Sequence, residues 1–344
     1  MSKFRVTWVD SAVFAAFWAI ARPAFAPRRS RQTETVMAVH RHSRQLALAA
    51  GVVVTGLACA ALAWATLLTP ELVVNAKGRQ FDASASAGVA NIAYAQSRPG
   101  HPGQFDVYVK PAGQPRYKVN ARGEAFAGGI DGNTLIYQSI RNGQSDLRLF
   151  DLATHTRSVP AGVNTRRAEY APTISGSWIL FGRLWHSHPL NSQVILHNTT
   201  TSETRVIAER INRRGRDVAP GQLNGDFATW QSDNARTGGA NVFLYQISTS
   251  ASTKVPEPTG KVQYFPAVAP SGAVFYVRSN TKCGAHVVLR EYASGVDTPL
   301  AVMPRGYDIF RTFAVDEGSG VTSVYFSRYQ CSTGRSHIYK ITVG

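Results

Sequence analysis

The chain has 344 residues, 44% of them hydrophobic and 17% charged, and it carries 37 Lys and Arg against 21 Asp and Glu. The apolar fraction excludes a wholly disordered chain, while 29 Gly, 17 Pro and many β-branched and aromatic residues argue against a helical bundle or a coiled coil. The expected class is a β-rich globule, and the length allows one large domain or two ordinary ones.

Residues 1–45 form a basic N-terminal segment that carries only a short apolar run, at residues 11–21. That run is too short to span a bilayer. We interpret the segment either as a cytoplasmic extension or as a wrongly extended start, because Met37 opens a conventional signal layout. Both Met1 and Met37 stay open as the true start.

An uncharged stretch follows and predicts export. Residues 46–68 contain no charge and come directly after Arg41, His42 and Arg44. At about 1.5 Å per residue they are long enough to cross a hydrocarbon core of about 30 Å, and the basic flank is expected on the cytoplasmic side. We therefore predict a signal-peptide core or a transmembrane helix at 46–69. Cleavage and retention both stay open, because 63–65 (Ala-Trp-Ala) and 74–76 (Val-Asn-Ala) offer small residues at cleavage positions.

The exported part contains six copies of one repeat. In each copy a short apolar strand is centred on an aromatic residue, and another strand follows 10 to 13 residues later. Gly-centred turns such as Asp131-Gly132 and Asn142-Gly143 separate the strands. Four short strands per 40 to 50 residues is typical of a propeller blade, so we predict an all-β, six-bladed β-propeller over residues 71–344. The six aromatic residues are Tyr94, Tyr137, Phe181, Trp230, Tyr276 and Phe326.

One copy shows a resemblance to a known repeat. Residues 265–280 (Phe-Pro-Ala-Val-Ala-Pro-Ser-Gly, then an apolar strand), followed by 286–292, are similar to the repeat of TolB-type, WD40-like β-propellers. The resemblance covers residues 85–344 and implies the propeller fold. It implies little about function, because such repeats occur in scaffolds, in periplasmic proteins and in the non-catalytic propellers of peptidases.

Two further expectations follow from the ring. The last copy lacks an outer strand, and residues 71–75 (Glu-Leu-Val-Val-Asn) are expected to supply it and to cover an open sheet edge.

Cys283 and Cys331 lie in equivalent loops of the fifth and sixth copies. Because equivalent loops of neighbouring blades are close in space and the exterior is oxidising, we predict a disulfide between them.

Motifs for catalysis or metal binding are weak in this sequence. It has no Gly-x-Ser-x-Gly elbow, no phosphate loop and no His-Glu-x-x-His motif. The cluster 185–188 (Trp-His-Ser-His) places two His residues two positions apart, but a metal site would need a further ligand. We expect an exposed polar loop there, with no metal and no cofactor.

Charge points to one face of the predicted ring. Loops that lead into the innermost strands, together with loops between second and third strands, carry 18 Lys and Arg against eight Asp and Glu, whereas the opposite loops carry six against eight. A one-sided cationic surface attracts anions, and Arg binds carboxylate or phosphate in bidentate fashion. The candidate ligand-binding residues are Arg166, Arg167, Arg210, Arg213, Arg214 and Arg216.

These observations predict a secreted or membrane-anchored propeller, monomeric and without catalysis of its own. It would act as a binding or scaffold module at the cell envelope, and its partner would be an envelope protein or an anionic envelope polymer rather than nucleic acid. A propeller enzyme stays open as the alternative, namely a lyase or hydrolase that acts on acidic glycans in the central funnel. Catalysis would require carboxylates, His or a metal that converge on the funnel.

Overall fold

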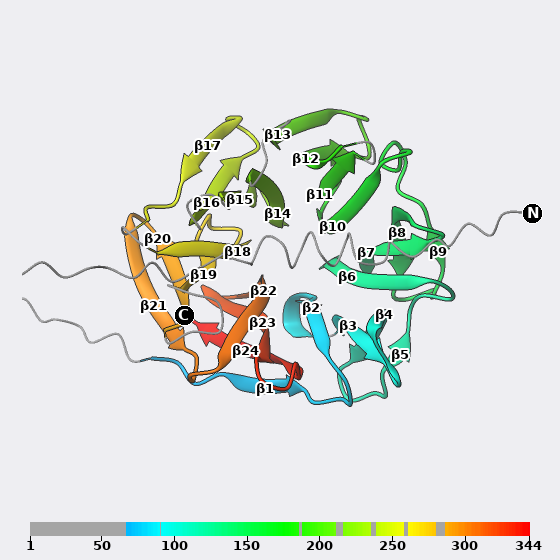
Figure 1. Ribbon diagram of the computed structural model, residues 1–344. Helices are drawn as coiled ribbons and strands as arrows, with labels where there is room; N and C mark the ends of the chain where they lie inside the picture. The colour runs from blue at the N-terminus through cyan, green and yellow to red at the C-terminus, as the bar shows by residue number, and fades with distance from the viewer. Residues whose placement is uncertain are drawn as a thin grey trace, which may run out of the picture. The chain divides into compact units, whose positions relative to one another are not determined.

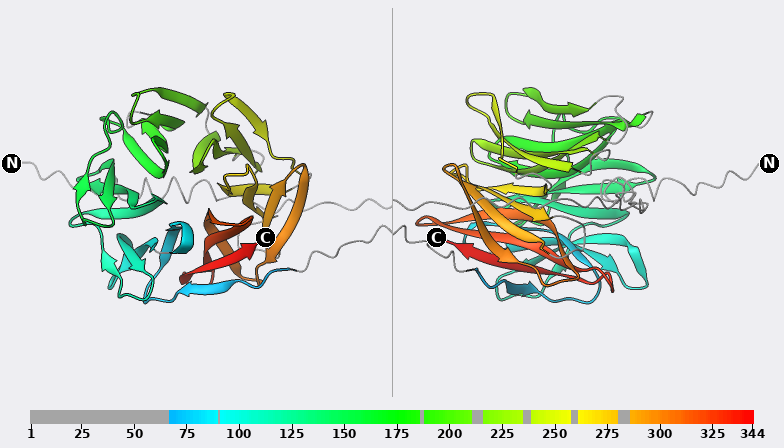
Figure 2. Two further views of the ribbon diagram at one scale, coloured as in Figure 1. Left: turned by 180° about the vertical axis from the view of Figure 1, so that it is seen from behind. Right: turned by 60° about the vertical axis from the view of Figure 1, so that its left-hand side comes forward.

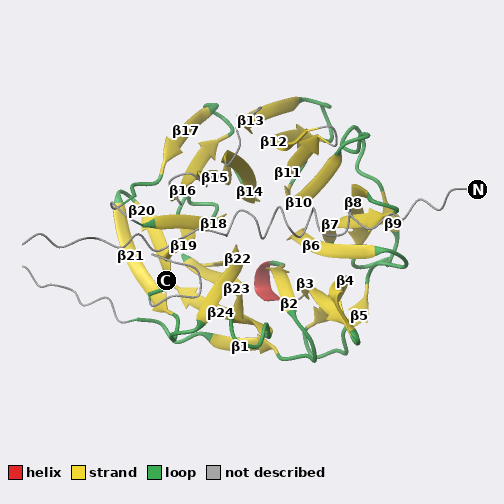
Figure 3. Ribbon diagram, viewed as in Figure 1, coloured by secondary structure: helices red, strands yellow, loops and turns green. Residues whose placement is uncertain are grey.

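The computed structural model describes residues 67–89, 91–185, 188–210, 216–234, 239–257, 261–279 and 286–344. In this part of the chain, six four-stranded antiparallel sheets form the blades of a propeller around a central axis (Figure 1). Apart from the short 3-10 helix η1 (Ala87–Val89), the regular structure in these ranges consists of strands (Figure 3). The predicted all-β, six-bladed propeller is confirmed.

Strands of each blade follow one another in chain order from the axis outwards. Blade 1 comprises β2 (Gln80–Ala85), β3 (Asn91–Arg98), β4 (His101–Pro111) and β5 (Tyr117–Lys118). Blade 2 comprises β6 (Glu124–Asp131), β7 (Thr134–Arg141), β8 (Gln144–Asp151) and β9 (Arg157–Ser158). Blade 3 comprises β10 (Ala168–Ser175), β11 (Trp178–Trp185), β12 (His188–Asn198) and β13 (Thr204–Arg210).

The second half of the ring repeats this order until its last blade. Blade 4 comprises β14 (Arg216–Asn224), β15 (Phe227–Asn234), β16 (Gly239–Gln246) and β17 (Ala251–Lys254). Blade 5 comprises β18 (Val262–Val268), β19 (Val274–Ser279), β20 (Val288–Ala293) and β21 (Val296–Val302). Blade 6 comprises β22 (Tyr307–Gly318), β23 (Val321–Gln330), β24 (Ser336–Val343) and, as its outer strand, β1 (Glu71–Val74).

Ring closure joins the beginning of the described chain to its end. β1 pairs antiparallel with β24, with Glu71 opposite Lys340 and Val74 opposite Ile338. The views in Figures 1 and 2 show β1 (blue) beside β24 (red) at the outer margin of the ring. The expectation that residues 71–75 close the last blade is therefore confirmed, and the closing strand hides an edge that would otherwise be open to association.

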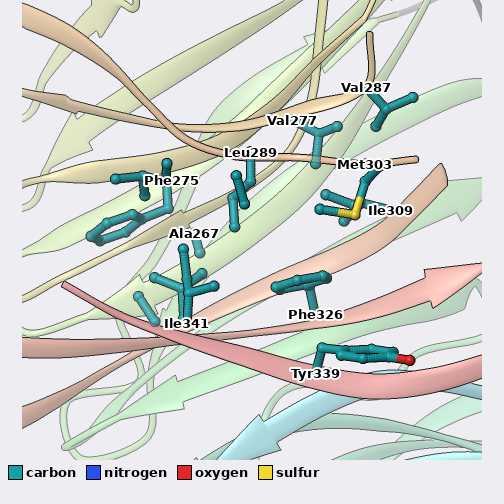
Figure 4. Close-up of a cluster of buried hydrophobic side chains, with 14 of the residues drawn as sticks. Ala267, Phe275, Val277, Val287, Leu289, Met303, Ile309, Phe326, Tyr339 and Ile341 are labelled. Atoms are coloured by element: carbon teal, nitrogen blue, oxygen red, sulfur yellow. The ribbon is translucent and has the colours of Figure 1, made fainter. Parts of the chain in front are cut away.

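The core lies between neighbouring blades, because each sheet buries both of its faces against the next. The six aromatic residues of the repeat are all buried, with exposures from 0% to 7%. The largest cluster lies between blades 5 and 6, where Phe275 and Leu289 meet Phe326 and Ile341 (Figure 4). Burial of this kind is the main stabilising contribution in a fold of short strands, at about 25 cal/mol per Å² of apolar surface.

The predicted signal or transmembrane segment lies outside the described residues, except for its last positions. Among the described residues there is no helix with the length and hydropathy that a membrane span requires. Leu68 is held against blade 5, where its amide donates to the Leu300 carbonyl at 2.7 Å. Cys283 also lies outside the described residues, so its pairing with Cys331 stays a prediction.

Candidate functional site

The propeller has two loop faces of different composition. One face carries the loops that lead into each innermost strand and the loops between second and third strands; we call it the arginine-rich face. The other carries the hairpins between first and second strands, and we call it the hairpin face. The order of the strands in all six sheets places the loops as the sequence predicted.

Five arginines of the arginine-rich face are exposed and have no ion pair with a described carboxylate. They lie in the connections between blades 1 and 2, 2 and 3, and 5 and 6, and between the second and third strands of blades 2 and 6. Side chains without a local counter-charge keep their attraction for an external anion. The five are Arg122, Arg141, Arg166, Arg305 and Arg335.

Other cations of this face are already engaged. Asp106 lies 2.8 Å from Arg98 and 2.9 Å from Lys118, and the two cations hold its pKa below the usual range although burial opposes the shift. Arg278 lies 2.7 Å from Asp297, which stands near the start of β21. Long arginine side chains can reach along the blade to a carboxylate at its other end. A count of charged residues in each loop therefore misses such ion pairs. The free positive charge is therefore smaller than the sequence count.

Glu169 forms a further pair within the face. Its carboxylate is fully buried and accepts from the Arg183 Nε at 2.9 Å and from the Thr165 hydroxyl at 2.7 Å. Burial raises the pKa of Glu169, and the contacts to Thr165 and Arg183 oppose this rise. Removal of one partner from a buried pair leaves an uncompensated charge, so we assign Arg183 a structural role.

The six predicted ligand-binding arginines have different environments. Arg166 is exposed, whereas Arg167 is half-buried and makes other contacts. Arg210 donates to the Glu209 carbonyl and to the Ser232 hydroxyl, both at 3.2 Å. Arg213 and Arg214 lie outside the described residues, and Arg216 begins β14.

An aromatic belt beneath this face was missed at the sequence level. Its rings follow one another from blade 5 to blade 2, with centroid distances of 5.5 Å (Phe265 to Phe310), 5.4 Å (Phe310 to Phe81), 5.7 Å (Phe81 to Phe105) and 5.3 Å (Phe105 to Phe126). All but Phe105 are half-buried. Phe81 and Phe126 are 45 residues apart, the period of the repeat, and this spacing was the signal available in the sequence.

At the waist of the ring, every innermost strand is interrupted by a bulge or register shift. From blade 6, the Arg311 guanidinium lies 3.7 Å from the Asp82 carboxylate of blade 1 and donates to the Pro172 carbonyl of blade 3 at 3.3 Å. The Gln222 side chain of blade 4 donates to the Ala314 carbonyl at 2.6 Å and accepts from the Ala314 amide at 2.7 Å. These side chains cross-link strands on different sides of the axis.

A pair of carboxylates lies where blade 4 meets the arginine-rich face. Asp217 and Asp233 are directly opposite on β14 and β15. Burial and the neighbouring Asp217 raise the pKa of Asp233 to about 7, although the Gln231 amide donates to it. Burial also raises the pKa of Asp217 and of Tyr170, whose hydroxyl donates to the Val218 carbonyl at 3.0 Å. Two like charges in a buried site favour retention of a proton.

The His cluster at 185–188 is only partly described. His186 and Ser187 lie outside the described residues, and Trp185 and His188 are opposite one another at the ends of β11 and β12. Among the described residues, there is no group of three or more His, Cys, Asp or Glu side chains that could hold a metal ion.

The architecture defines the chain as a six-bladed β-propeller with a strand from its N-terminal side closing the ring. No family model matches the sequence, and no curated protein matches it. Solved structures similar to it include TolB from Acinetobacter baumannii, with a TM-score of 0.51, 16% identity, and coverage of 74% of this chain and 64% of that one. The chain thus spans less than two thirds of the length of that TolB.

Two other solved structures are similar. A TolB-type protein from Agrobacterium tumefaciens has a TM-score of 0.52 at 12% identity, with coverage of 80% of this chain and 94% of that one. An oligogalacturonate lyase in complex with manganese has a TM-score of 0.49 at 12% identity, with coverage of 79% of this chain and 84% of that one. The structural neighbours are TolB-like and other propeller proteins, and at these identities the likeness concerns the fold alone.

Proposed function

We propose that the chain is an exported propeller that acts as a binding or scaffold module at the cell envelope and engages an anionic partner through the arginine-rich face. The observation that carries this proposal is the set of five exposed arginines on one face without a described counter-charge. Export follows from the uncharged stretch at 46–68. The partner is an acidic polymer or the acidic surface of an envelope protein.

The aromatic belt adds to this proposal. Half-buried phenylalanines at the inner ends of the loops offer apolar contact area beneath the arginines. A binding surface that joins apolar contact with peripheral charge gains specificity from the charge and affinity from the buried area. Polyanions that carry apolar groups therefore fit this face better than simple salts.

A binding experiment tests the proposal with two polyanions, polygalacturonate and poly-L-glutamate, immobilised on a sensor. The protein should bind at about 50 mM NaCl and lose most of the binding at about 300 mM, because salt screens exposed charges. The triple variant Arg122→Glu, Arg166→Glu, Arg305→Glu should not bind. Arg116→Glu changes net charge equally from an exposed position in the turn between β4 and β5, on the other side of the ring, so Arg166→Glu should weaken binding more. Unchanged binding by the triple variant would contradict the proposal.

The alternative is an enzyme that acts on acidic glycans, and one observation favours it. Asp233 has a pKa of about 7 and lies beside Asp217, so the pair can hold and release a proton near neutral pH. If this alternative holds, polygalacturonate should gain new chain ends on incubation with the protein, and Asp233→Asn should abolish the gain while retaining the binding. Retention of full-length polymer by the wild-type protein would contradict the enzyme alternative.

A further inference from the structure

A cavity opens among the hairpins of the hairpin face, on the side of the ring away from the exposed arginines. Its volume is about 330 Å³, at the lower end of the range for small-molecule sites. Innermost strands and hairpins of blades 1, 2, 3, 4 and 6 line it, so it depends on a closed ring. A site of this size suits a ligand comparable to an amino acid rather than a folded partner.

Two carboxylates give this cavity its charge. Asp131, from the hairpin of blade 2, accepts from the Gly176 amide at 2.6 Å, and Asp316, from blade 6, accepts from the Gly318 amide at 2.9 Å. Each bond involves one of the two carboxylate oxygens. The lining includes no Lys, Arg or His, and no cation among the described residues forms an ion pair with either aspartate.

This lack of counter-charge contrasts with two other acids on the same side of the ring. Glu203 lies 2.6 Å from Arg205, and the Arg290 Nε lies 2.6 Å from Asp297. Glu203 and Asp297 are thus neutralised locally, whereas the two aspartates that line the cavity are exposed and can attract an incoming cation.

Apolar side chains supply part of the cavity wall, beside polar ones such as Ser175 and Asn224. Ile130, Leu223, Phe313 and Val315 line it and are buried in the ring. The Gln222 amide, which also lines it, is held by Ala314 and by the Val268 amide, so it is fixed in place. A ligand that pairs with the aspartates at the rim can therefore place a short hydrocarbon part against these walls.

We propose that this cavity binds a small organic ammonium ion with a short aliphatic chain. The ammonium group pairs with Asp131 and Asp316, and the chain lies against the apolar walls. The site is separate from the arginine-rich face and has the opposite charge, so the proposal does not depend on the anionic partner.

Titration calorimetry with pentylammonium tests the proposal on the complete propeller. Pentylammonium should bind, whereas pentanol, which lacks the charge, and pentanoate, which reverses it, should bind at least roughly tenfold more weakly. In the double variant Asp131→Asn, Asp316→Asn, each side chain keeps an oxygen that can accept from the backbone amide but loses its charge. Its affinity for pentylammonium should be roughly tenfold lower than that of the wild type. Asp151→Asn removes an exposed carboxylate from another hairpin-side turn and should leave binding unchanged.

Three results would overturn the proposal. The first is absence of pentylammonium binding to the wild-type protein, and the second is equal binding by the double variant while its thermal midpoint is retained. The third is competition by Ca²⁺ that displaces pentylammonium completely at equimolar concentration, which would indicate an inorganic cation site instead. If the double variant fails to fold, the single variant Asp316→Asn provides the same comparison, because the Asp316 carboxylate accepts from the Gly318 amide within its own turn.

Discussion

Arg311 shows how one side chain can connect distant parts of the ring. Only 13% of its side chain is exposed, and its guanidinium joins blade 6 to Asp82 of blade 1 and to the Pro172 carbonyl of blade 3. Burial lowers the pKa of Arg311 and raises that of Asp82, and the partner opposes the shift in each case. Both residues have positive φ, 40° for Arg311 and 52° for Asp82, so the bulges that present them carry backbone strain.

We therefore expect Arg311→Met to lower the free energy of unfolding by about 3 kcal/mol, because Asp82 would keep a buried charge without a partner. Urea denaturation measures this loss. The double variant Arg311→Met, Asp82→Asn should recover part of it, and Arg305→Met, at an exposed position, should change stability by less than about 0.5 kcal/mol. Equal stability of Arg311→Met and the wild type would show that the cross-link contributes nothing.

Asp233 makes stability depend on pH. Its pKa is raised from 3.8 to about 7 in the folded protein, so the folded state binds the proton more tightly than the unfolded state does. The stabilisation by this proton is complete below the unfolded pKa and is lost as pH rises towards 7.

Asp233→Asn should accordingly be more stable than the wild type at about pH 8, by about 2 kcal/mol, and should show a flatter stability profile between about pH 5 and pH 8. Urea midpoints at several pH values provide the measurement. Asp151→Asn, at an exposed turn where backbone amides lower the carboxyl pKa, serves as the control and should keep the wild-type profile in this range. An unchanged profile for Asp233→Asn would show that the carboxyl is ionised in the folded protein.

At the scale of elements, β1 decides whether the ring is closed. Val74 is 4% exposed, and the surrounding segment is held by further contacts, from Lys110 Nζ to the Val73 carbonyl at 3.3 Å and from the Gln96 amide to the Lys77 carbonyl at 2.8 Å. Of the two cleavage positions left open by the sequence, the one after Ala76 would remove β1. The one after Ala65 would leave β1 in the mature chain.

A protein that begins at Lys77 should therefore have a thermal midpoint lower by about 5 to 10 °C than one that begins at Leu67. It should also self-associate, because β24 would expose its edge. Calorimetry and light scattering measure these effects. Leu72→Thr changes an exposed position of β1 without removing the strand and should leave both properties unchanged. A monomeric Lys77 form with the full thermal midpoint would show that β1 is dispensable.

At the scale of the whole molecule, the ring presents two loop faces of opposite character. Exposed arginines gather on one face, and the uncompensated aspartates of the cavity lie on the other. This separation of charge gives the propeller a preferred orientation in a charged environment. Both faces depend on the closed ring. A covalent link between neighbouring blades, such as blades 5 and 6, would stabilise that ring.

The predicted disulfide between Cys283 and Cys331 is such a link. It would close a loop of 48 residues, worth roughly 4 kcal/mol in the chain-entropy treatment. We expect the protein produced in an oxidising compartment to show this bond in non-reducing peptide mapping and to lose thermal stability on reduction. The double variant Cys283→Ser, Cys331→Ser should match the reduced protein, whereas recovery of free thiols at both positions from oxidising conditions would refute the pairing.

Sequence alone determined the architecture, because the repeat is local: each copy carries its own buried aromatic, its own turns and its own strand alternation. It also determined that residues 71–75 complete the last blade, since a missing strand leaves one edge to fill. Tertiary structure alone decided which charges are free. Among the described residues, Arg278 reaches Asp297, whereas Asp131 forms no ion pair. Ion pairing depends on side-chain reach across a sheet and between blades, which spacing along the chain does not encode. The same reason explains the cavity, the aromatic belt and the Asp217 and Asp233 pair, all of which unite residues from different strands or blades.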